Sequence, residues 1–169
     1  MRRLLDSLAA LDRVPAARKD TFVVALRRGW LLYRLGRYAE AVDAYNAAIT
    51  ANPKAVEARV GILLPQLALR KWVDVEANAR GALRLDPGNY LANLRLAFAC
   101  YNLHRYDEAA GFYRKLHELY PSDVDVISGL GWALVKAGKV AEAAPIFREG
   151  AELAPKHAAI RDGVKVSGG

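Results

Sequence analysis

Apolar residues recur at helical spacing in the first part of the chain. Between residues 20 and 35 they fall at intervals of three and four, so that they line one face of an α-helix. Gly36 and Arg37 interrupt this pattern, and the same spacing resumes over residues 38–51. The pattern therefore predicts two helices, over 20–35 and 38–51, joined by a tight turn.

The same unit returns along the chain with a period of 34 residues. Four of the seven prolines share one register, and two further positions keep the same interval. The three series are Pro53, Pro87, Pro121 and Pro155; Ala41, Val75, Ala109 and Ala143; and Tyr38, Trp72, Tyr106 and Val140. A register shared by so many positions predicts four tandem helix pairs.

Helix starts and charges follow this period. Asn52-Pro53 and Asp86-Pro87 each place a residue with N-cap preference before a proline, which predicts that the next helix starts at the proline. Ser122 together with Asp125 predicts a related capping box. Bases follow each first helix and acids open each second helix, where they complement the helix dipoles. These eight residues are Arg37, Lys71, Arg105, Lys139, Glu40, Asp74, Glu108 and Glu142.

In this register the residues resemble the tetratricopeptide repeat family, whose pattern combines Trp, Leu-Gly, Tyr, Ala, Phe and Pro. The eighth position holds Gly29, Leu63, Ala97 and Gly131; the twenty-fourth holds Tyr45, Ala79, Tyr113 and Phe147; the twenty-seventh holds Ala48, Ala82, Leu116 and Gly150. The resemblance implies an all-α fold, a right-handed superhelical solenoid of helix-turn-helix repeats. The expected repeats are 22–55, 56–89, 90–123 and 124–157.

The segments outside these repeats are expected to cap the stack. Residues 1–21 carry an amphipathic stripe of leucines, which predicts an N-terminal capping helix. The stripe consists of Leu4, Leu5, Leu8 and Leu11. Residues 158–169 predict a C-terminal capping helix followed by a frayed tail.

Three residues depart from the family pattern. Pro65 lies inside the first helix of the second repeat, where it removes a backbone hydrogen bond and crowds the carbonyl of Gly61, so we expect a kink. Pro145 lies early in the last repeat's second helix, where it is either tolerated or bends the helix. Arg28 takes a position usually filled by leucine, and we expect it against the N-terminal helix or in solvent.

The first helices carry a second apolar stripe besides the one that packs on the partner helix. In the tetratricopeptide repeat family these positions line the concave groove of the superhelix, and the resemblance implies the same here. The alternative is that packing between repeats buries them, but so many aromatic residues on one lining favour a binding groove. The candidate groove residues are Leu26, Trp30, Tyr33, Leu64, Leu67, Leu94, Arg95, Phe98, Tyr101, Trp132, Val135 and Lys136.

This lining does not match the carboxylate clamp of some family members. Those proteins hold a C-terminal carboxylate with lysine, asparagine and arginine side chains on their first helices. The matching positions here are Leu26, Trp30, Gly61, Leu91 and Arg95. Only Arg95 agrees, and one arginine does not pin the anion, so we expect no carboxylate clamp.

The residues that could carry chemistry are scattered. His104, His117 and His157 lie far from one another, and His104, four residues after Cys100, falls in the predicted turn between two helices. The single cysteine excludes an internal disulfide, and its position on an inward helix face predicts a core residue. We expect no enzymatic activity, no cofactor and no bound metal.

The net charge of +7 arises mainly in the first 55 residues, which hold ten basic and five acidic side chains. Such an excess suits an acidic protein, an anionic membrane or nucleic acid, but it also serves solubility. We interpret the chain as a module that binds an apolar peptide or an amphipathic helix of another protein. The alternative is a scaffold that associates with its own copies, and nucleic-acid binding is a distant third because the arginines lack aromatic interleaving.

No apolar run approaches the roughly 18 residues of a membrane helix, and residues 1–13 do not read as a signal peptide. We therefore expect a cytoplasmic protein without membrane insertion. Removal of an upstream signal would leave the periplasm open.

Overall fold

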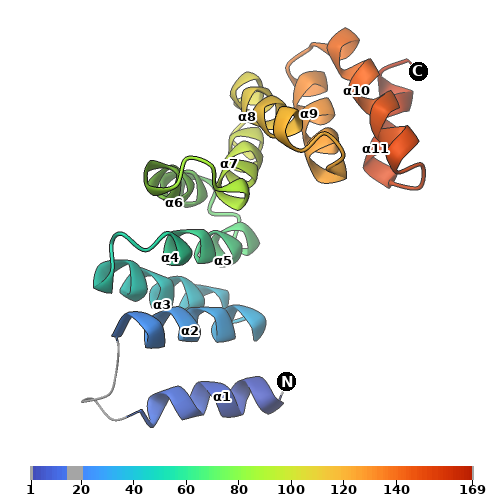
Figure 1. Cartoon of the computed structure of the whole chain (residues 1–169). Helices are drawn as coiled ribbons and strands as arrows, with labels where there is room; N and C mark the ends of the chain where they lie inside the picture. The colour runs from blue at the N-terminus through green and yellow to red at the C-terminus, as the bar shows by residue number, and fades with distance from the viewer. Residues whose placement is uncertain (1, 15–20, 169) are drawn as a thin grey trace. The chain divides into compact units, whose positions relative to one another are not determined.

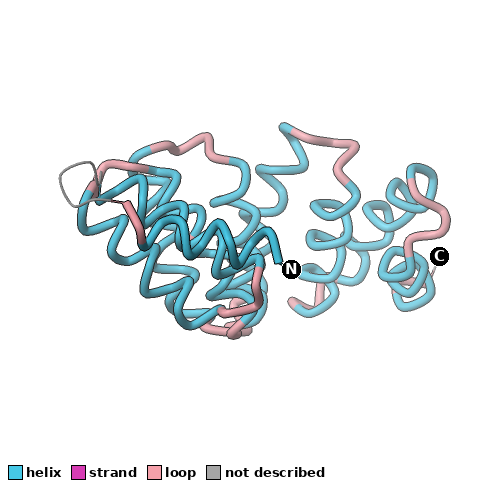
Figure 2. The backbone as a smooth tube through the Cα atoms, turned by 90° about the horizontal axis from the view of Figure 1, so that it is seen from below, coloured by secondary structure: helices cyan, strands magenta, loops and turns pink. Residues whose placement is uncertain are grey.

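The computed structural model describes residues 2–14 and 21–168, and every regular element in those ranges is an α-helix (Figure 1, Figure 2). The chain divides into two compact units, Met1–Ala92 and Asn93–Gly169. Met1, residues 15–20 and Gly169 lie outside the described residues. The predicted N-terminal segment 1–21 and the predicted frayed tail are therefore described only in part.

The helices come in pairs that keep the 34-residue register. The first unit contains α1 (Arg2–Asp12), α2 (Thr21–Arg34), α3 (Tyr38–Ala51), α4 (Val56–Gly61), α5 (Leu63–Ala68) and α6 (Trp72–Leu85). Next come α7 (Tyr90–Asn102), which begins in the first unit, and α8 (Tyr106–Leu119), α9 (Val124–Lys136), α10 (Val140–Leu153) and α11 (Ala158–Val166) of the second. The helices α4, α7, α9 and α11 start 34 residues apart, which is the period that the prolines predict.

Helix α1 packs on the first helix pair through its leucine stripe. Leu8 is buried in a cluster with Leu31 and Leu32 of α2, and Leu4 and Leu11 pack against the same cluster. Arg28 of α2 pairs with Asp12 at the end of α1. The expectation that Arg28 faces the N-terminal helix is thus confirmed.

The predicted helix starts at the prolines are wrong. Asn52 ends α3, and α4 begins only at Val56, after Ala55 has closed a turn by donating its N–H to the Asn52 carbonyl at 3.1 Å. The physical reason is that a residue before proline is pushed out of the helical region, so α3 stops at Asn52, and the Asn52 side chain then accepts the Lys54 N–H at 3.3 Å within the turn. Asp86 ends α6 in the same way.

The predicted capping box at Ser122 is also displaced by one residue. Asp123 is the N-cap of α9, because its carboxylate accepts the N–H groups of Asp125 at 3.0 Å and Val126 at 3.2 Å. A carboxylate at this place satisfies two orphan donors and favours the positive end of the helix dipole.

The two prolines that lie inside predicted helices, Pro65 and Pro145, affect their helices differently. Near Pro65, where a kink was expected, the first helix of the second repeat divides at Ile62 into α4 and α5. Pro145 lies within α10, which runs from Val140 to Leu153 without interruption, so it is tolerated.

Aromatic side chains from the second helices pack against glycines of two first helices. In the first unit the Tyr45 ring lies against Gly29 of α2 and Gly61 of α4, where an added Cβ would come within 2.8 Å and 2.5 Å of the ring. In the second unit Phe147 lies against Gly131 of α9 and Gly163 of α11, where the corresponding distances are 2.6 Å and 2.2 Å. Only glycine leaves room for these rings, so each ring holds three helices together.

The second repeat exchanges the sizes of the two positions. It has Leu63 where the first and last repeats have glycine, and Ala79 where they have Tyr45 and Phe147. Both Leu63 and Ala79 are fully buried. The volume has moved from the second helix to the first, which explains why the second repeat keeps a buried core despite its departure from the family pattern.

The turn inside each pair uses a left-handed backbone conformation at one equivalent position. Gly36 and Gly138 have φ angles of 76° and 79°, and Arg70 and His104 adopt 55° and 61° at the same place. Residues other than glycine reach this region only at an energetic cost. The middle two repeats therefore carry a local strain that the first and last repeats avoid.

Candidate binding surface on the first helices

The twelve predicted groove residues all lie on α2, α5, α7 and α9, the first helices of the four pairs. None of them is buried, whereas neighbours such as Leu31, Ile127 and Leu134 on the same helices are. The helical spacing thus separates a core face from a second, accessible face in each pair. In the first unit we use the name α2 face for the accessible residues of α2 and α5, which are Val23, Leu26, Arg27, Trp30, Arg34, Leu64 and Leu67.

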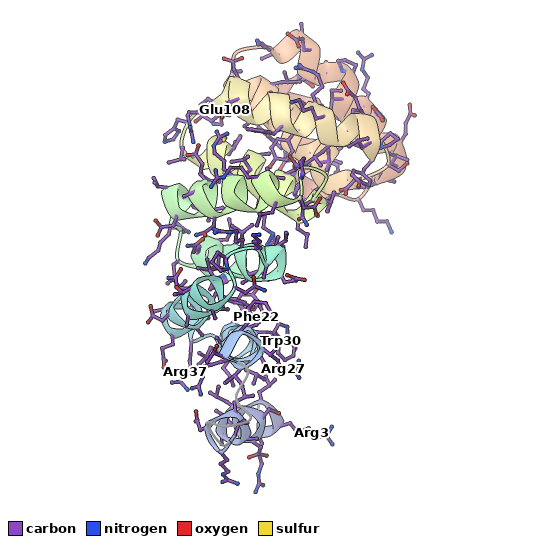
Figure 3. All side chains as sticks on the ribbon, turned by 60° about the vertical axis from the view of Figure 1, so that its left-hand side comes forward. Arg3, Phe22, Arg27, Trp30, Arg37 and Glu108 are labelled. Carbon is purple, nitrogen blue, oxygen red and sulfur yellow. The ribbon has the colours of Figure 1, made fainter. Side chains whose placement is uncertain are left out.

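Trp30 is the centre of the α2 face. Its side chain is 36 % exposed, and the guanidinium groups of Arg27 and Arg34 lie over its ring at 4.7 Å and 5.3 Å from the centroid. The three residues are spaced by three and four positions, so they share one side of α2. Figure 3 shows Arg27 and Trp30 on the same side of this helix, with Arg37 on the other.

The arginines around α2 fall into two groups. Arg28 pairs with Asp12, and Arg37 donates to Glu40 at 2.7 Å, a hydrogen bond that lowers the pKa of the Glu40 carboxyl group. Arg27 and Arg34 make no ion pair among residues 2–14 and 21–168. Within the described residues, the two arginines beside Trp30 are therefore not neutralised by an ion pair, whereas Arg28 is.

Apolar residues extend the α2 face on both sides of Trp30. Val23, one turn before Leu26, is exposed, and Leu26 is half-buried. Leu64 and Leu67 of α5 are also half-buried. Tyr33 packs against Tyr38 with ring centroids 5.8 Å apart, so it belongs partly to the turn between α2 and α3.

In the second unit the predicted residues of α7 include an exposed aromatic side chain. Phe98 is 44 % exposed, while Leu94, Arg95 and Tyr101 are half-buried. The Tyr101 ring meets Tyr106 edge-on at 5.4 Å, and burial together with Tyr106 raises the pKa of its phenol group.

Trp132 of α9 differs from Trp30 although both occupy the same repeat position. Its indole N–H donates to the Ala159 carbonyl of α11 at 3.0 Å, and its ring meets Phe147 edge-on at 5.6 Å. It is half-buried, as is Val135, and Lys136 is exposed at the end of α9. Trp132 therefore takes part in packing the C-terminal helix.

Sequence models of one family match three stretches of the chain, residues 24–55, 66–124 and 103–164, each under the description tetratricopeptide repeat. The helix pairs of the structure and their 34-residue register are those expected of the repeats that these models describe. The chain is a tetratricopeptide repeat protein.

Solved tetratricopeptide repeat structures share this fold at low sequence identity. YrrB, described as a TPR protein with an unusual peptide-binding site, has a TM-score of 0.82 at 19 % identity over 95 % of this chain and 82 % of its own. A MamA protein reaches 0.81 at 22 % identity over 92 % of both chains. MamA from Desulfovibrio magneticus RS-1 reaches 0.81 at 14 % identity over 89 % of this chain and 90 % of its own. No curated protein sequence matches the chain.

Cys100 and the three histidines of this repeat protein have different surroundings. Cys100 is fully buried, so the expectation of a core cysteine is confirmed. His104 occupies a turn and contacts the Tyr106 hydroxyl at 2.6 Å, and His117 of α8 meets Glu149 of α10 at 3.3 Å. His157 is the N-cap residue of α11. Among the described residues no helix is long and apolar enough to cross a membrane.

Sequence reasoning found Trp30 but missed the two arginines that stack on it. Their spacing of three residues before and four after the tryptophan was a sufficient signal, because such positions are neighbours on a helix surface. Sequence reasoning also placed Trp132 with Trp30, since nothing local to α9 shows that α11 will cover it.

Proposed function

We propose that this tetratricopeptide repeat protein binds an apolar extended segment or an amphipathic helix of another protein on the accessible faces of its first helices, without catalysing a reaction. The observation that carries the proposal is the pair of exposed aromatic side chains, Trp30 and Phe98, on helices whose opposite faces are fully packed. Exposed aromatic residues on a rigid helix face are typical anchors of protein interfaces.

The fold supports this proposal, because buried aromatic rings hold the helix pairs together and thereby keep the accessible faces of the first helices rigid. YrrB shares the fold and is described as having a peptide-binding site. A helix face that needs no reordering on binding loses less entropy than a flexible loop does. The lining is mostly apolar, which favours an apolar or amphipathic ligand over a purely polar one.

The test uses a partner captured from the native source and measured by calorimetry against defined variants. Trp30→Ala and Phe98→Ala should each weaken binding by about 1–3 kcal/mol, the usual cost of removing an aromatic anchor. Val73→Ala is the matched control, because Val73 is 66 % exposed but lies on the second helix α6. Full affinity in the Trp30→Ala/Phe98→Ala double variant would reject the proposal.

The alternative is a scaffold that associates with copies of itself. Light scattering over a range of concentrations distinguishes the two functions, since self-association raises the mass with concentration. A mass that stays at the 18.5 kDa of one chain would reject the scaffold.

A further inference from the structure

We propose that the α2 face selects acidic segments, in which side-chain carboxylates flank one apolar anchor residue. The anchor packs on Trp30, and the carboxylates pair with Arg27 and Arg34. This inference rests on the proposed function and names the class of partner segment that this part of the surface takes.

The first argument is charge complementarity. Helix α2 contains three arginines and no acidic residue, and the two beside Trp30 are exposed and make no ion pair in the described part of the chain. The third, Arg28, pairs with Asp12 of α1. An acidic partner would thus find two available cations on the same side as the exposed ring.

The second argument is the geometry of the two guanidinium groups. Both lie over the Trp30 ring, at 4.7 Å and 5.3 Å from its centroid, and a guanidinium group held on a ring in this way can still bind a carboxylate with two parallel hydrogen bonds. Stacking also restricts the long arginine side chains before binding, which lowers the entropy lost on pairing. The cluster is therefore organised in advance for planar anions.

Spacing suggests the form of the ligand. Arg27 and Arg34 are seven residues apart, which places their Cα atoms about 10 Å apart along the helix. In an extended segment, residues two before and two after an anchor project on the anchor's side and lie about 13 Å apart. The acidic side chains of the segment can lean towards the anchor and span this difference, so acid–x–anchor–x–acid is the simplest matching pattern.

The surroundings favour an acidic peptide over a nucleic acid. A strand of nucleic acid needs a track of several cations and free aromatic faces for its bases. Beyond Arg27 and Arg34, the neighbouring helix α4 offers only Arg59, which is half-buried and donates to the Pro53 carbonyl at 3.5 Å. At the candidate positions of α5, in the same unit, half-buried leucines stand in place of cations, namely Leu64 and Leu67.

The experiment measures binding of labelled, end-blocked peptides by fluorescence anisotropy. One peptide has glutamates two positions before and two after a leucine anchor, a second has glutamine at those two places, and a third is the glutamate peptide with a free C-terminus. We expect the glutamate peptide to bind about tenfold more tightly than the glutamine peptide. The free C-terminus should change nothing, because the carboxylates recognised are those of side chains.

The protein variants identify the arginines responsible. Arg27→Gln/Arg34→Gln should bring the glutamate peptide down to the affinity of the glutamine peptide. Arg2→Gln/Arg3→Gln is the matched control, because it removes the same charge from exposed residues of α1 and should preserve the preference. Far-UV circular dichroism of both variants checks that the helices remain.

Three outcomes would overturn the inference. Equal binding of the glutamate and glutamine peptides, with loss of both in Trp30→Ala, would leave the proposed function standing and remove only the acidic selectivity. No measurable binding of the glutamate peptide would reject the inference, while the captured partner still decides the proposed function. Tighter binding of a single-stranded oligonucleotide, lost in Arg27→Gln/Arg34→Gln, would assign the cluster to nucleic acid instead.

Discussion

Trp30 in the first repeat and Trp132 in the last stand at the same repeat position and have different surroundings. Trp30 is covered by two arginine side chains and keeps a third of its surface in solvent. Trp132 is held by a hydrogen bond to Ala159 and by the Phe147 ring. The same residue is a candidate ligand-binding group at one place and a packing group at the other.

The neighbouring elements explain this difference. The helix that follows the last repeat, α11, offers the Ala159 carbonyl to the indole and places Gly163 against Phe147. At the other end, α1 contacts α2 through Leu8 and the Arg28–Asp12 pair, away from the Trp30 side. The comparison shows that equivalent positions of a repeat protein acquire different roles from the helix packed beside them.

The largest effect on stability is expected when each tryptophan is replaced with alanine. Trp132→Ala should lower the free energy of unfolding by about 3 kcal/mol, because it empties a packed site and strands a hydrogen-bond acceptor. Trp30→Ala should cost only about 0.5–1 kcal/mol, the worth of exposed cation–π contacts. Urea denaturation followed by circular dichroism measures both, and equal costs would mean that the two rings are packed alike.

A second test uses the aromatic residues that pack against the glycines. Tyr45 is 4 % exposed. Its burial is the main cause, and the nearby Tyr33 a smaller one, that raises the pKa of the Tyr45 phenol to about 12. Phe147, at the same position of the last repeat, has no ionisable group. The folded state therefore prefers the protonated phenol. The associated stability is complete below the unfolded pKa of about 10 and is lost as the pH rises towards 12.

Tyr45→Phe should remove this alkaline sensitivity in the first repeat. At pH 12 the variant should retain about 2 kcal/mol that the parent chain loses, measured as the difference between urea midpoints at neutral and alkaline pH. Tyr120→Phe is the control, because Tyr120 is 42 % exposed. An identical pH profile for parent and Tyr45→Phe would show that the phenol does not stay protonated in the folded chain.

The smallest expected effect concerns the turns. The first and last repeats have glycine at the left-handed position, and the second has Arg70. Arg70→Gly should raise the free energy of unfolding by about 0.5–1 kcal/mol, since relief of backbone strain exceeds the entropy that glycine adds to the unfolded chain. Thermal unfolding measures the change. Arg70→Ala serves as the control and should bring no gain, and a gain there would assign the effect to the lost charge.

Several features of the fold followed from local sequence. The 34-residue register predicted the spacing at which α4, α7, α9 and α11 begin, although the prolines that were assigned to helix starts lie in the turns before these helices. Pro65 predicted the interruption between α4 and α5, because proline acts on its own helix. The positions of Arg28 beside the N-terminal helix and of Cys100 in the core were predicted correctly. The apolar spacing defines the core face of each helix, and a residue's position in the sequence then fixes its angle from that face.

The sequence by itself determined the repeat, its helix pairs and the two faces of each first helix, since these depend on interactions within a few residues of each other. The tertiary structure alone decided which accessible-face residues stay open. Trp132 donates its indole N–H to a backbone carbonyl of α11, and because every residue has such a carbonyl, no side-chain pattern predicts this contact. Asp12 of α1 pairs with Arg28 and not with Arg27 or Arg34, and that choice depends on how α1 packs against α2.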